Sequence, residues 1–418
     1  MELKKYKLGD CLFLIKNGAV IQQRKGCTGI PITRIETLSN NRFNRDRLGY
    51  ADITNTTPYS DYILDDCDLL MSHINSREFL GRTVLYQKKG NECIIHGMNL
   101  LRIKVNPLIL DSHYAYYLFQ TSYLKKLIDS IRKDAINQSS ISISDVSNLK
   151  FDLPSVENQK LIVKSLKILD QKIALNRAIN DNLEAMAKQI YDYWFVQFDF
   201  PNEEGKPYKS CGGKMVWNEN LKREIPEGWN DGCFSDIANI TMGQSPDGSS
   251  YNEDSEGVIF YQGSTDFGIR FPSVRMYTTA PTRFAKQGDI LMSVRAPVGA
   301  VNIANTDCCI GRGLSAINSK IGSMTYIYFV IHYLKVRFDN LNSVGTTFGS
   351  ITKDDLHGLP IVIPSSDVIK MFESISKPIF DKQMNIGQEI ENLTKQRDEL
   401  LPLLMNGQVS VNYHLSDD

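Results

Sequence analysis

The chain has 418 residues, of which 42% are hydrophobic and 23% charged, and its formal net charge is −1 at pH 7. This composition excludes a disordered or fibrous protein, and the near-neutral charge argues against a protein that coats nucleic acid without regard to sequence. A chain of this length usually folds as two or three domains. Because we find no apolar run long enough to cross a bilayer and no signal-like segment after Met1, we expect a cytoplasmic protein without membrane contact.

The eight cysteines are scattered along the chain, and only Cys308 and Cys309 are adjacent. None belongs to a CxxC pair, and the six histidines supply no HxH or HExxH motif. Protein zinc sites usually show such spacings. We therefore expect free thiols and no metal site.

Residues 1–155 are expected to form the first domain. Residues 1–60 hold ten Lys or Arg against five Asp or Glu, so one face could be basic, although a solvated loop surface would give the same count. A β-branched run (CII, residues 93–95), turns rich in Gly, Asn and Ser, and one helix-like stretch (YAYYLFQ, residues 114–120) predict mixed α and β structure.

Residues 156–196 are expected to form a long spacer helix with Ser155 as its N-cap. Apolar side chains recur at alternating spacings of four and three, and Asn176 and Asn180 fall in the same stripe. A globular core can produce such a pattern. The length, the repetition later in the chain and the paired asparagines favour a coiled coil, because polar seam residues fix its register. About 40 helical residues would span roughly 60 Å.

Residues 197–228 are expected to connect this helix to a second domain, residues 229–365. A helix-like stretch (residues 324–331) and the β-rich runs VIFY (residues 258–261) and AVNI (residues 300–303) again predict mixed structure.

The second domain repeats the first. The stretch DLLMS (residues 68–72) recurs as DILMS (residues 289–293), and SISIS (residues 140–144) recurs near SITKD (residues 350–354). After SISIS and after SITKD, the chain continues through an apolar strand that ends in Pro-Ser. Such self-similarity predicts two homologous domains of the α+β class.

Residues 366–408 are expected to form a second spacer helix, capped by Ser365 or Ser366 and bearing a similar apolar stripe. Pro378 should kink or restart this helix, since proline lacks a backbone donor. Two such helices of one chain can pair, and an antiparallel arrangement is expected.

Several stretches resemble the specificity subunits of type I restriction-modification systems, and the resemblance covers essentially the whole chain. The stretches that resemble the family's bridge between its halves are YWFVQFDFP (193–201), NEEGKPY (202–208), GKMVW (213–217) and EIPEGW (224–229). Those that resemble its exits from the recognition domains and its helix start are INQSSI (136–141), GTTFGSI (345–351) and ENQ (157–159).

The resemblance implies two target-recognition domains separated by a long antiparallel pair of coiled-coil helices. Each domain would read one half of a split, asymmetric site in double-stranded DNA. The helices would set the unread gap and dock two methyltransferase subunits and, where the system has them, two restriction–translocase subunits. The helix residues that we assign to this docking element are Leu166, Leu169, Ile173, Leu183, Ile190, Ile390, Leu393 and Leu400.

The sequence lacks the motifs of the chemistry that such systems perform. An amino-methyltransferase needs a Pro-Pro loop, and the nearest string, at Asn106 and Pro107, continues with leucine. Gly311 and Gly313 form a GxG without the third glycine of a nucleotide-binding loop. We therefore expect a non-catalytic subunit without cofactor, with S-adenosylmethionine bound only by the methyltransferase. A coiled-coil scaffold that binds proteins and a stand-alone endonuclease are the alternatives.

DNA readout requires cationic and amide side chains on loops. The candidates in the first domain are Arg24, Lys25, Arg34, Arg42, Arg45, Arg77 and Gln138. The candidates in the second domain are Gln244, Ser245, Tyr251, Gln262, Arg275, Arg295, Arg312 and Thr347. Arg77 and Arg295 lead because each follows the repeated strand end, at roughly equivalent places.

Overall fold

The computed structural model of the chain describes residues 2–24, 28–39, 41–135, 138–343 and 349–409. The chain divides into two compact units: unit 1 comprises Met1–Ile173 and Asn392–Asp418, and unit 2 comprises Ala174–Glu391. Each unit contains part of two long helices, α4 (Val156–Tyr191) and α8 (Ser366–Met405). None of the described helices combines the length and the apolarity that crossing a membrane requires.

Unit 1 is built on a four-stranded antiparallel sheet in the order β2-β10-β7-β9. The strands are β2 (Leu12–Asn17), β7 (Leu69–Ser72), β9 (Thr83–Leu85) and β10 (Leu100–Val105). Strand β7 is buried on both faces, because Leu69 and Met71 join one apolar cluster and Leu70 joins another. A strand buried on both faces is apolar throughout, which explains the repeated stretch at residues 68–72.

Unit 2 contains a sheet of the same size and order, β17-β25-β22-β23. The strands are β17 (Ala238–Met242), β22 (Ile290–Ser293), β23 (Val301–Ile303) and β25 (Leu314–Ser319). Strand β22 is again buried on both faces, with Ile290 and Met292 in one cluster and Leu291 in another. The shared topology confirms that the chain repeats one mixed α and β domain.

Shorter strands complete each unit. In unit 1 they are β1 (Lys4–Lys7), β3 (Ile30–Ile32), β4 (Leu38–Ser39), β5 (Arg42–Phe43), β6 (Gly49–Ala51), β8 (Ile74–Asn75), β11 (Lys133–Asp134), β12 (Ser139–Ser140) and β13 (Lys150–Leu153). In unit 2 they are β14 (Met215–Asn218), β15 (Arg223–Pro226), β16 (Asn230–Cys233), β18 (Tyr251–Asn252), β19 (Val258–Tyr261), β20 (Tyr277–Thr278), β21 (Phe284–Ala285), β24 (Cys308–Ile310) and β26 (Pro360–Ile363). The pair β1-β13 in unit 1 corresponds to the pair β16-β26 in unit 2.

The remaining helices follow the same order in part. Unit 1 contains α1 (Ser112–Gln120), α2 (Ser122–Ser130) and α3 (Ile143–Ser147), and unit 2 contains α5 (Phe234–Ile237), α6 (Met324–Ser343) and α7 (Lys353–His357). Helix α6 follows β25 as α1 and α2 follow β10, and α7 takes the place of α3, whereas α5 precedes its sheet. The repeat at residues 140–144 and 350–354 has a local cause. The Ser142 hydroxyl accepts a hydrogen bond from the Asp145 amide (3.1 Å), and the Thr352 hydroxyl accepts one from the Asp355 amide (3.2 Å), so each stretch caps the next helix.

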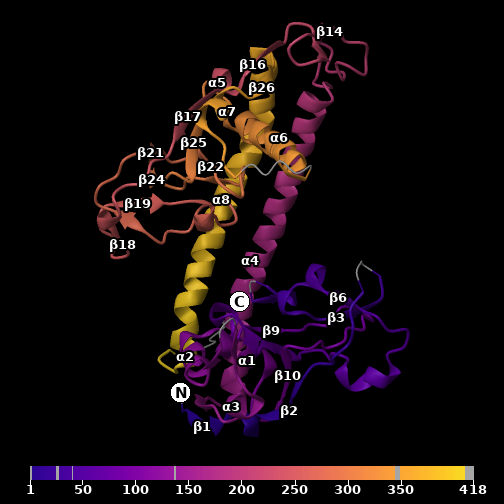
Figure 1. The fold of residues 1–418 in the computed structure, drawn as a ribbon, viewed down its shortest axis with the longest axis vertical. Coiled ribbons are helices and arrows are strands. Elements are labelled where there is room, and N and C mark those ends of the chain that lie inside the picture. Colours follow the sequence, from indigo (N-terminus) through magenta and orange to yellow (C-terminus); the bar gives the residue numbers. More distant parts are fainter. Residues whose placement is uncertain (1, 25–27, 40, 136–137, 344–348, 410–418) are drawn as a thin grey trace, which may run out of the picture. The chain divides into compact units, whose positions relative to one another are not determined.

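The long helices run antiparallel where they contact each other. Within unit 2, Gln383 Nε2 of α8 donates to the Asn180 carbonyl of α4 (3.3 Å), while further along α4 the ring of Tyr191 lies 6.2 Å from that of Phe372. Figure 1 shows each helix as one uninterrupted ribbon. Helix α4 ends in a π-helical turn, Asp192–Val196.

Helix α8 continues through Pro378, so the restart expected there is wrong. The missing backbone donor costs about 3 kcal/mol in a helix interior. Phe372, fully buried and six residues before the proline, and Phe380, packed against the same apolar cluster, offset that cost by anchoring both sides of the proline. Burying a phenylalanine contributes roughly 1.5–3 kcal/mol.

The aromatic stretch after α4 is a packing element of unit 2. The rings of Trp194 and Phe195 contact Phe372 of α8 at centroid distances of 5.8 and 4.9 Å, and Phe200 stacks on Trp229 at 4.9 Å. This cluster joins the end of α4 to the start of the second domain.

Candidate nucleic-acid interface

In each unit, two loops cross so closely that only glycine fits. A Cβ added to Gly18 would lie 2.0 Å from the Gly97 carbonyl oxygen, and one added to Gly243 would lie 2.2 Å from that of Gly311. We call each pair the glycine crossing of its unit. In each crossing, the first glycine follows the edge strand, β2 or β17, and the second precedes the strand β10 or β25. The GxG motif at residues 311–313 does not match a nucleotide-binding loop. Its first glycine is instead required by the close backbone contact with Gly243.

The crossing of unit 2 gathers predicted DNA-contacting residues. Arg312, between the two glycines, and Arg295 both line a hollow of about 410 Å³, and both side chains are exposed. The Arg312 amide donates to the Ser245 hydroxyl (3.3 Å), and Ser245 follows Gln244 directly. The Gly311 amide donates to the Tyr261 carbonyl (2.8 Å), which brings the neighbouring Gln262 to the same loop.

A second group adjoins it through Asp266. Its carboxylate, which is buried, accepts hydrogen bonds from the Gln262 amide (2.7 Å) and from Arg275 Nε (2.8 Å). Tyr251 packs on Phe260 with ring centroids 4.9 Å apart and donates to the Pro246 carbonyl. The structure thus links the described candidates of unit 2 into one surface region. Thr347 lies outside the described residues.

A hollow of unit 1 has a volume of about 640 Å³, and its lining includes Arg77, Arg82, Lys125 and Lys126. Arg77 is exposed, and its Nη2 lies 3.5 Å from Asp129 of α2. Sequence reasoning missed Arg82 and the lysine pair. The adjacent lysines on a short amphipathic helix were the available signal.

The other candidates of unit 1 differ in their surroundings. Arg24 forms an ion pair with Asp52, and Arg34 donates to Gln23. Arg42 and Gln138 are exposed, and Lys25 lies outside the described residues.

Arg45 is held by internal contacts. Its guanidinium donates to both carboxylate oxygens of Glu92 and to the Gln87 carbonyl, and it lies over the rings of Phe43 and Tyr86. Hydrogen bonding from Arg45 lowers the pKa of Glu92 to about 2. These contacts stabilise the loop and leave Arg45 less free to contact DNA.

Arg77 and Arg295 lie in equivalent loops of the two units, but at different positions within those loops. The loop begins after Ser72 or Ser293 and closes where the amide of Gly81 or Gly299 donates back to that serine's carbonyl. Within it, Arg295 bridges to Ser350, whereas Ile74 pairs with Ser140. Because Ser140 and Ser350 correspond, the counterpart of Arg295 is Ile74, and the predicted equivalence with Arg77 holds only for the loop.

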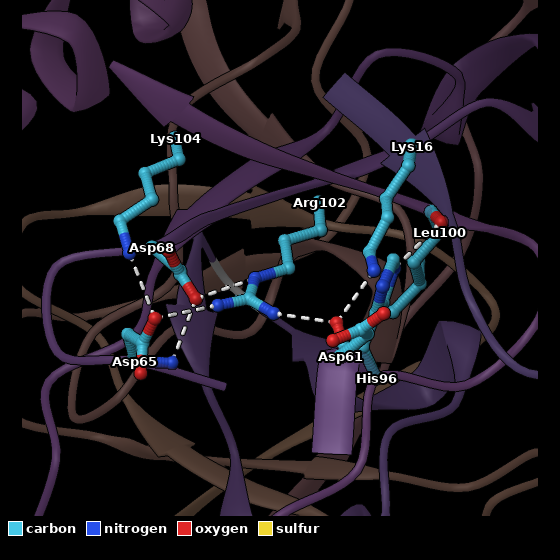
Figure 2. A network of polar contacts seen from close by, with 8 residues as sticks. All are labelled: Lys16, Asp61, Asp65, Asp68, His96, Leu100, Arg102 and Lys104. Carbon is cyan, nitrogen blue, oxygen red and sulfur yellow. Dashed lines mark hydrogen bonds and ion pairs between the residues drawn. The ribbon is translucent and has the colours of Figure 1, made fainter. Parts of the chain in front are cut away.

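A buried charge network supports the sheet of unit 1 beside its crossing. Figure 2 shows the Arg102 guanidinium between two carboxylates: Nε donates to Asp68 Oδ2 (2.7 Å) and Nη2 to Asp65 Oδ2 (3.0 Å). Burial raises the pKa of Asp68, with Arg102 opposing this, while Lys104 lowers the pKa of Asp65. Nearby, His96 Nε2 lies 2.8 Å from the Leu100 carbonyl, and burial lowers the pKa of His96 to about 4.

In unit 2, the counterpart of Asp68 is held by uncharged donors. Asp289 accepts hydrogen bonds from the Lys286 amide (2.9 Å) and from Asn318 Nδ2 (3.2 Å). Among the described residues, no group of three or more His, Cys, Asp and Glu side chains could hold a metal ion.

The helix residues assigned to partner docking point inward for the most part. Leu166, Ile173, Ile390 and Leu393 are buried, Leu169, Leu183 and Ile190 are half-buried, and Leu400 is 37% exposed. Leu166 joins the core of unit 1, and Ile190 packs against the core of unit 2. A different apolar stripe is exposed on α4, and sequence reasoning did not single it out. Its members are Leu161, Ile168, Leu175, Ile179 and Met186.

Comparison with known proteins identifies the architecture. The family model of the type I restriction modification DNA specificity domain matches residues 1–185 and 226–401. A protein of Methanocaldococcus jannaschii, described as a candidate specificity subunit of the type I restriction enzyme MjaX, is 36% identical over 97% of this chain and 93% of its own length. The specificity subunit of the type I restriction enzyme HindI from Haemophilus influenzae is 25% identical over 69% of this chain and 74% of its own.

Among solved structures, the S subunit of a type I restriction-modification system from M. genitalium superposes with a TM-score of 0.55 at 15% identity. The match covers 97% of this chain and 96% of that one. At this identity the likeness concerns the fold alone.

Proposed function

Because this chain belongs to the type I restriction-modification DNA specificity family, its task is to specify a DNA sequence, and we propose that its two units each read one half of a split, asymmetric duplex site. The observation that carries this proposal is the repeated glycine crossing. The backbone of the crossing is the same in both units, but the side chains beside the crossing glycines differ. Two copies of one frame with different side chains suit two different half-sites.

The proposed reading surfaces are the two hollows together with the two crossings. The hollow of unit 2 presents Arg295 and Arg312, with Gln262 at the crossing beside Gly311, and the hollow of unit 1 presents Arg77 with the lysines of α2. Arginine and amide side chains can form paired hydrogen bonds with base edges, while lysines suit the phosphates. The net charge of −1 does not oppose this, since the cations are gathered locally.

The long helices serve as spacer and docking element in this proposal. Two methyltransferase subunits, and two restriction–translocase subunits where a system has them, would bind them, and the exposed stripe on α4 supports an apolar contact. Isolated exposed apolar residues are ordinary, but a row along one helix marks an interaction surface. Methylation and cleavage would belong to those cytoplasmic partners, with S-adenosylmethionine on the methyltransferase, and this chain would bind no cofactor.

A binding experiment tests the proposal. The complex of this chain with its methyltransferase should bind its duplex site with an affinity that falls steeply with salt. Scrambling either half of the site should weaken binding. Charge reversal at Arg77 or Arg295 (R77E, R295E) should cost about 1–3 kcal/mol. Binding that ignores salt and sequence would instead favour a protein-binding scaffold, and Mg²⁺-dependent cleavage by the purified chain would reveal a nuclease.

A further inference from the structure

The hydrogen-bond register aligns the two crossings residue by residue. Leu100 pairs with Ser72 in unit 1, and Leu314 pairs with Ser293 in unit 2. Two residues before these leucines, Met98 therefore corresponds to Arg312.

The facing loops align in the same way. The Ala19 amide donates to the His96 carbonyl (2.8 Å), and the Gln244 amide donates to the Ile310 carbonyl (3.0 Å). The residues that follow these amides, Val20 and Ser245, are therefore counterparts. Ile74 and Arg295 correspond through their pairing with Ser140 and Ser350.

At these three positions, the side chains of unit 2 are polar or charged and those of unit 1 are apolar. Unit 2 carries Ser245, Arg295 and Arg312, whereas unit 1 carries valine, isoleucine and methionine. The side chains at the tip of unit 1 are not core residues, because Val20 is 78% and Met98 is 50% exposed. The Gly97 amide donates to the Thr33 hydroxyl, and the next residue, Arg34, already donates to Gln23.

The four base pairs present different groups in the major groove. Guanine offers the acceptors O6 and N7, which an arginine can bind together, and thymine offers a methyl group, which prefers an apolar side chain. The exposed apolar residues Val20 and Met98 of unit 1 therefore suit a different base from the one that suits the arginines of unit 2.

We propose that the Val20–Met98 tip of unit 1 contacts the methyl group of a thymine in its half-site, whereas Arg312, with Arg295 beside it, contacts a guanine in the half-site of unit 2. The proposal rests on the two-reader function above and adds the base chemistry that each unit selects. It predicts a site whose two halves depend on different functional groups of DNA.

Base analogues test this directly on the complex with its methyltransferase. The half read by unit 1 is first assigned by exchanging residues 1–155 for those of a relative. Each thymine in that half is then replaced singly by deoxyuridine, which removes only the methyl group. One replacement should weaken binding about fourfold, the equivalent of one apolar carbon. In Met98→Ala with Val20→Ala, thymine and deoxyuridine should bind alike.

The matched control is Leu108→Ala, which removes another exposed apolar side chain of unit 1. It should keep the thymine preference. In the other half, replacing one guanine by 7-deazaguanine should weaken binding about tenfold, and Arg312→Gln should abolish that difference. Arg223→Gln, which removes an arginine that packs on Phe198 in the connecting segment, should keep it.

Two outcomes separate the inference from the function on which it rests. If the site is bound specifically but no deoxyuridine replacement matters, or the alanine variant still prefers thymine, the base assignment is wrong and the two-reader function stands. If the complex does not distinguish its site from a scrambled duplex, both fail.

Discussion

Arg270 Nη1, from the loop before β20, lies 3.3 Å from Glu184 Oε2 of α4 within unit 2. The guanidinium is 8% exposed, stacks on the rings of Tyr328 and Phe380, and also donates to Gln383 of α8. A loop cation placed between two helices fixes the recognition sheet of this unit on its helical support.

Arg270→Gln should therefore lower the free energy of unfolding by about 1.5–3 kcal/mol, since it removes the hydrogen bonds of a buried guanidinium to Glu184, Tyr328 and Gln383. Urea unfolding of the chain measures this. The control is Lys188→Gln, which removes an exposed ion pair with Asp192 on the same helix and should cost less than about 1 kcal/mol. Equal unfolding midpoints for the two variants would show that the buried pair has no special role.

Glu92 gives unit 1 an acid-sensitive contact. Its pKa falls from an ordinary 4.5 to about 2 in the folded chain, so the unfolded state binds more protons between these values. This contribution, up to about 3 kcal/mol, is present above pH 4.5 and is lost as the pH falls toward 2.

Glu92→Gln should accordingly be less stable near neutral pH and should lose less stability on acidification than the parent chain. Denaturant midpoints measured from pH 5 to pH 2.5 check the slope. Glu36→Gln, at an exposed position, is the control. A parent-like slope in Glu92→Gln would contradict the assignment.

The glycine crossing of unit 2 should be necessary for DNA reading. Gly243→Ala would place a methyl group against the Gly311 carbonyl and displace the loops that hold Arg312 and Ser245. We expect at least a tenfold loss of affinity, the equivalent of about 1.4 kcal/mol, with discrimination lost in one half-site only. Gly248→Ala, where an added Cβ meets nothing within 4 Å, should bind normally. Equal DNA affinity of the two variants would show that the crossing does not take part in DNA binding.

The spacer role of the helices predicts a change in the unread gap. Seven residues inserted in each helix, after Ile173 in α4 and after Glu391 in α8, preserve the heptad seam and add about 10 Å of helix. The gap between methylated half-sites should lengthen by about 3 base pairs, given about 3.4 Å per base pair. Sequencing of methylated DNA measures it, and an unchanged gap would show that the helices do not set the distance.

The sequence predicted the architecture because its signals are local. The repeated strand DLLMS or DILMS is apolar throughout because both faces are buried, and the helix caps Ser142 and Thr352 stand three residues before an aspartate. Heptad spacing likewise revealed both long helices. Each of these patterns follows from contacts within a few residues or from a regular period.

The parts that were missed depend on distant partners. Arg45 pairs with Glu92, which is 47 residues away in the sequence. Because the partner is so distant, the sequence around Arg45 does not distinguish it from any other loop arginine. The function of Gly311 becomes visible only when Gly243 crosses it. Continuity at Pro378 depends on packing around α8, and the exposed stripe on α4 could be separated from the buried seam only after both faces had been assigned.

The central claim is that two separate units read two separate half-sites. Exchanging residues 1–155 for those of a relative and sequencing the methylated DNA of cells that carry the chimaera with its methyltransferase tests this most directly. The account predicts that one half of the methylated site changes and the other half stays as it was. A site that changes in both halves, or in neither, would contradict it.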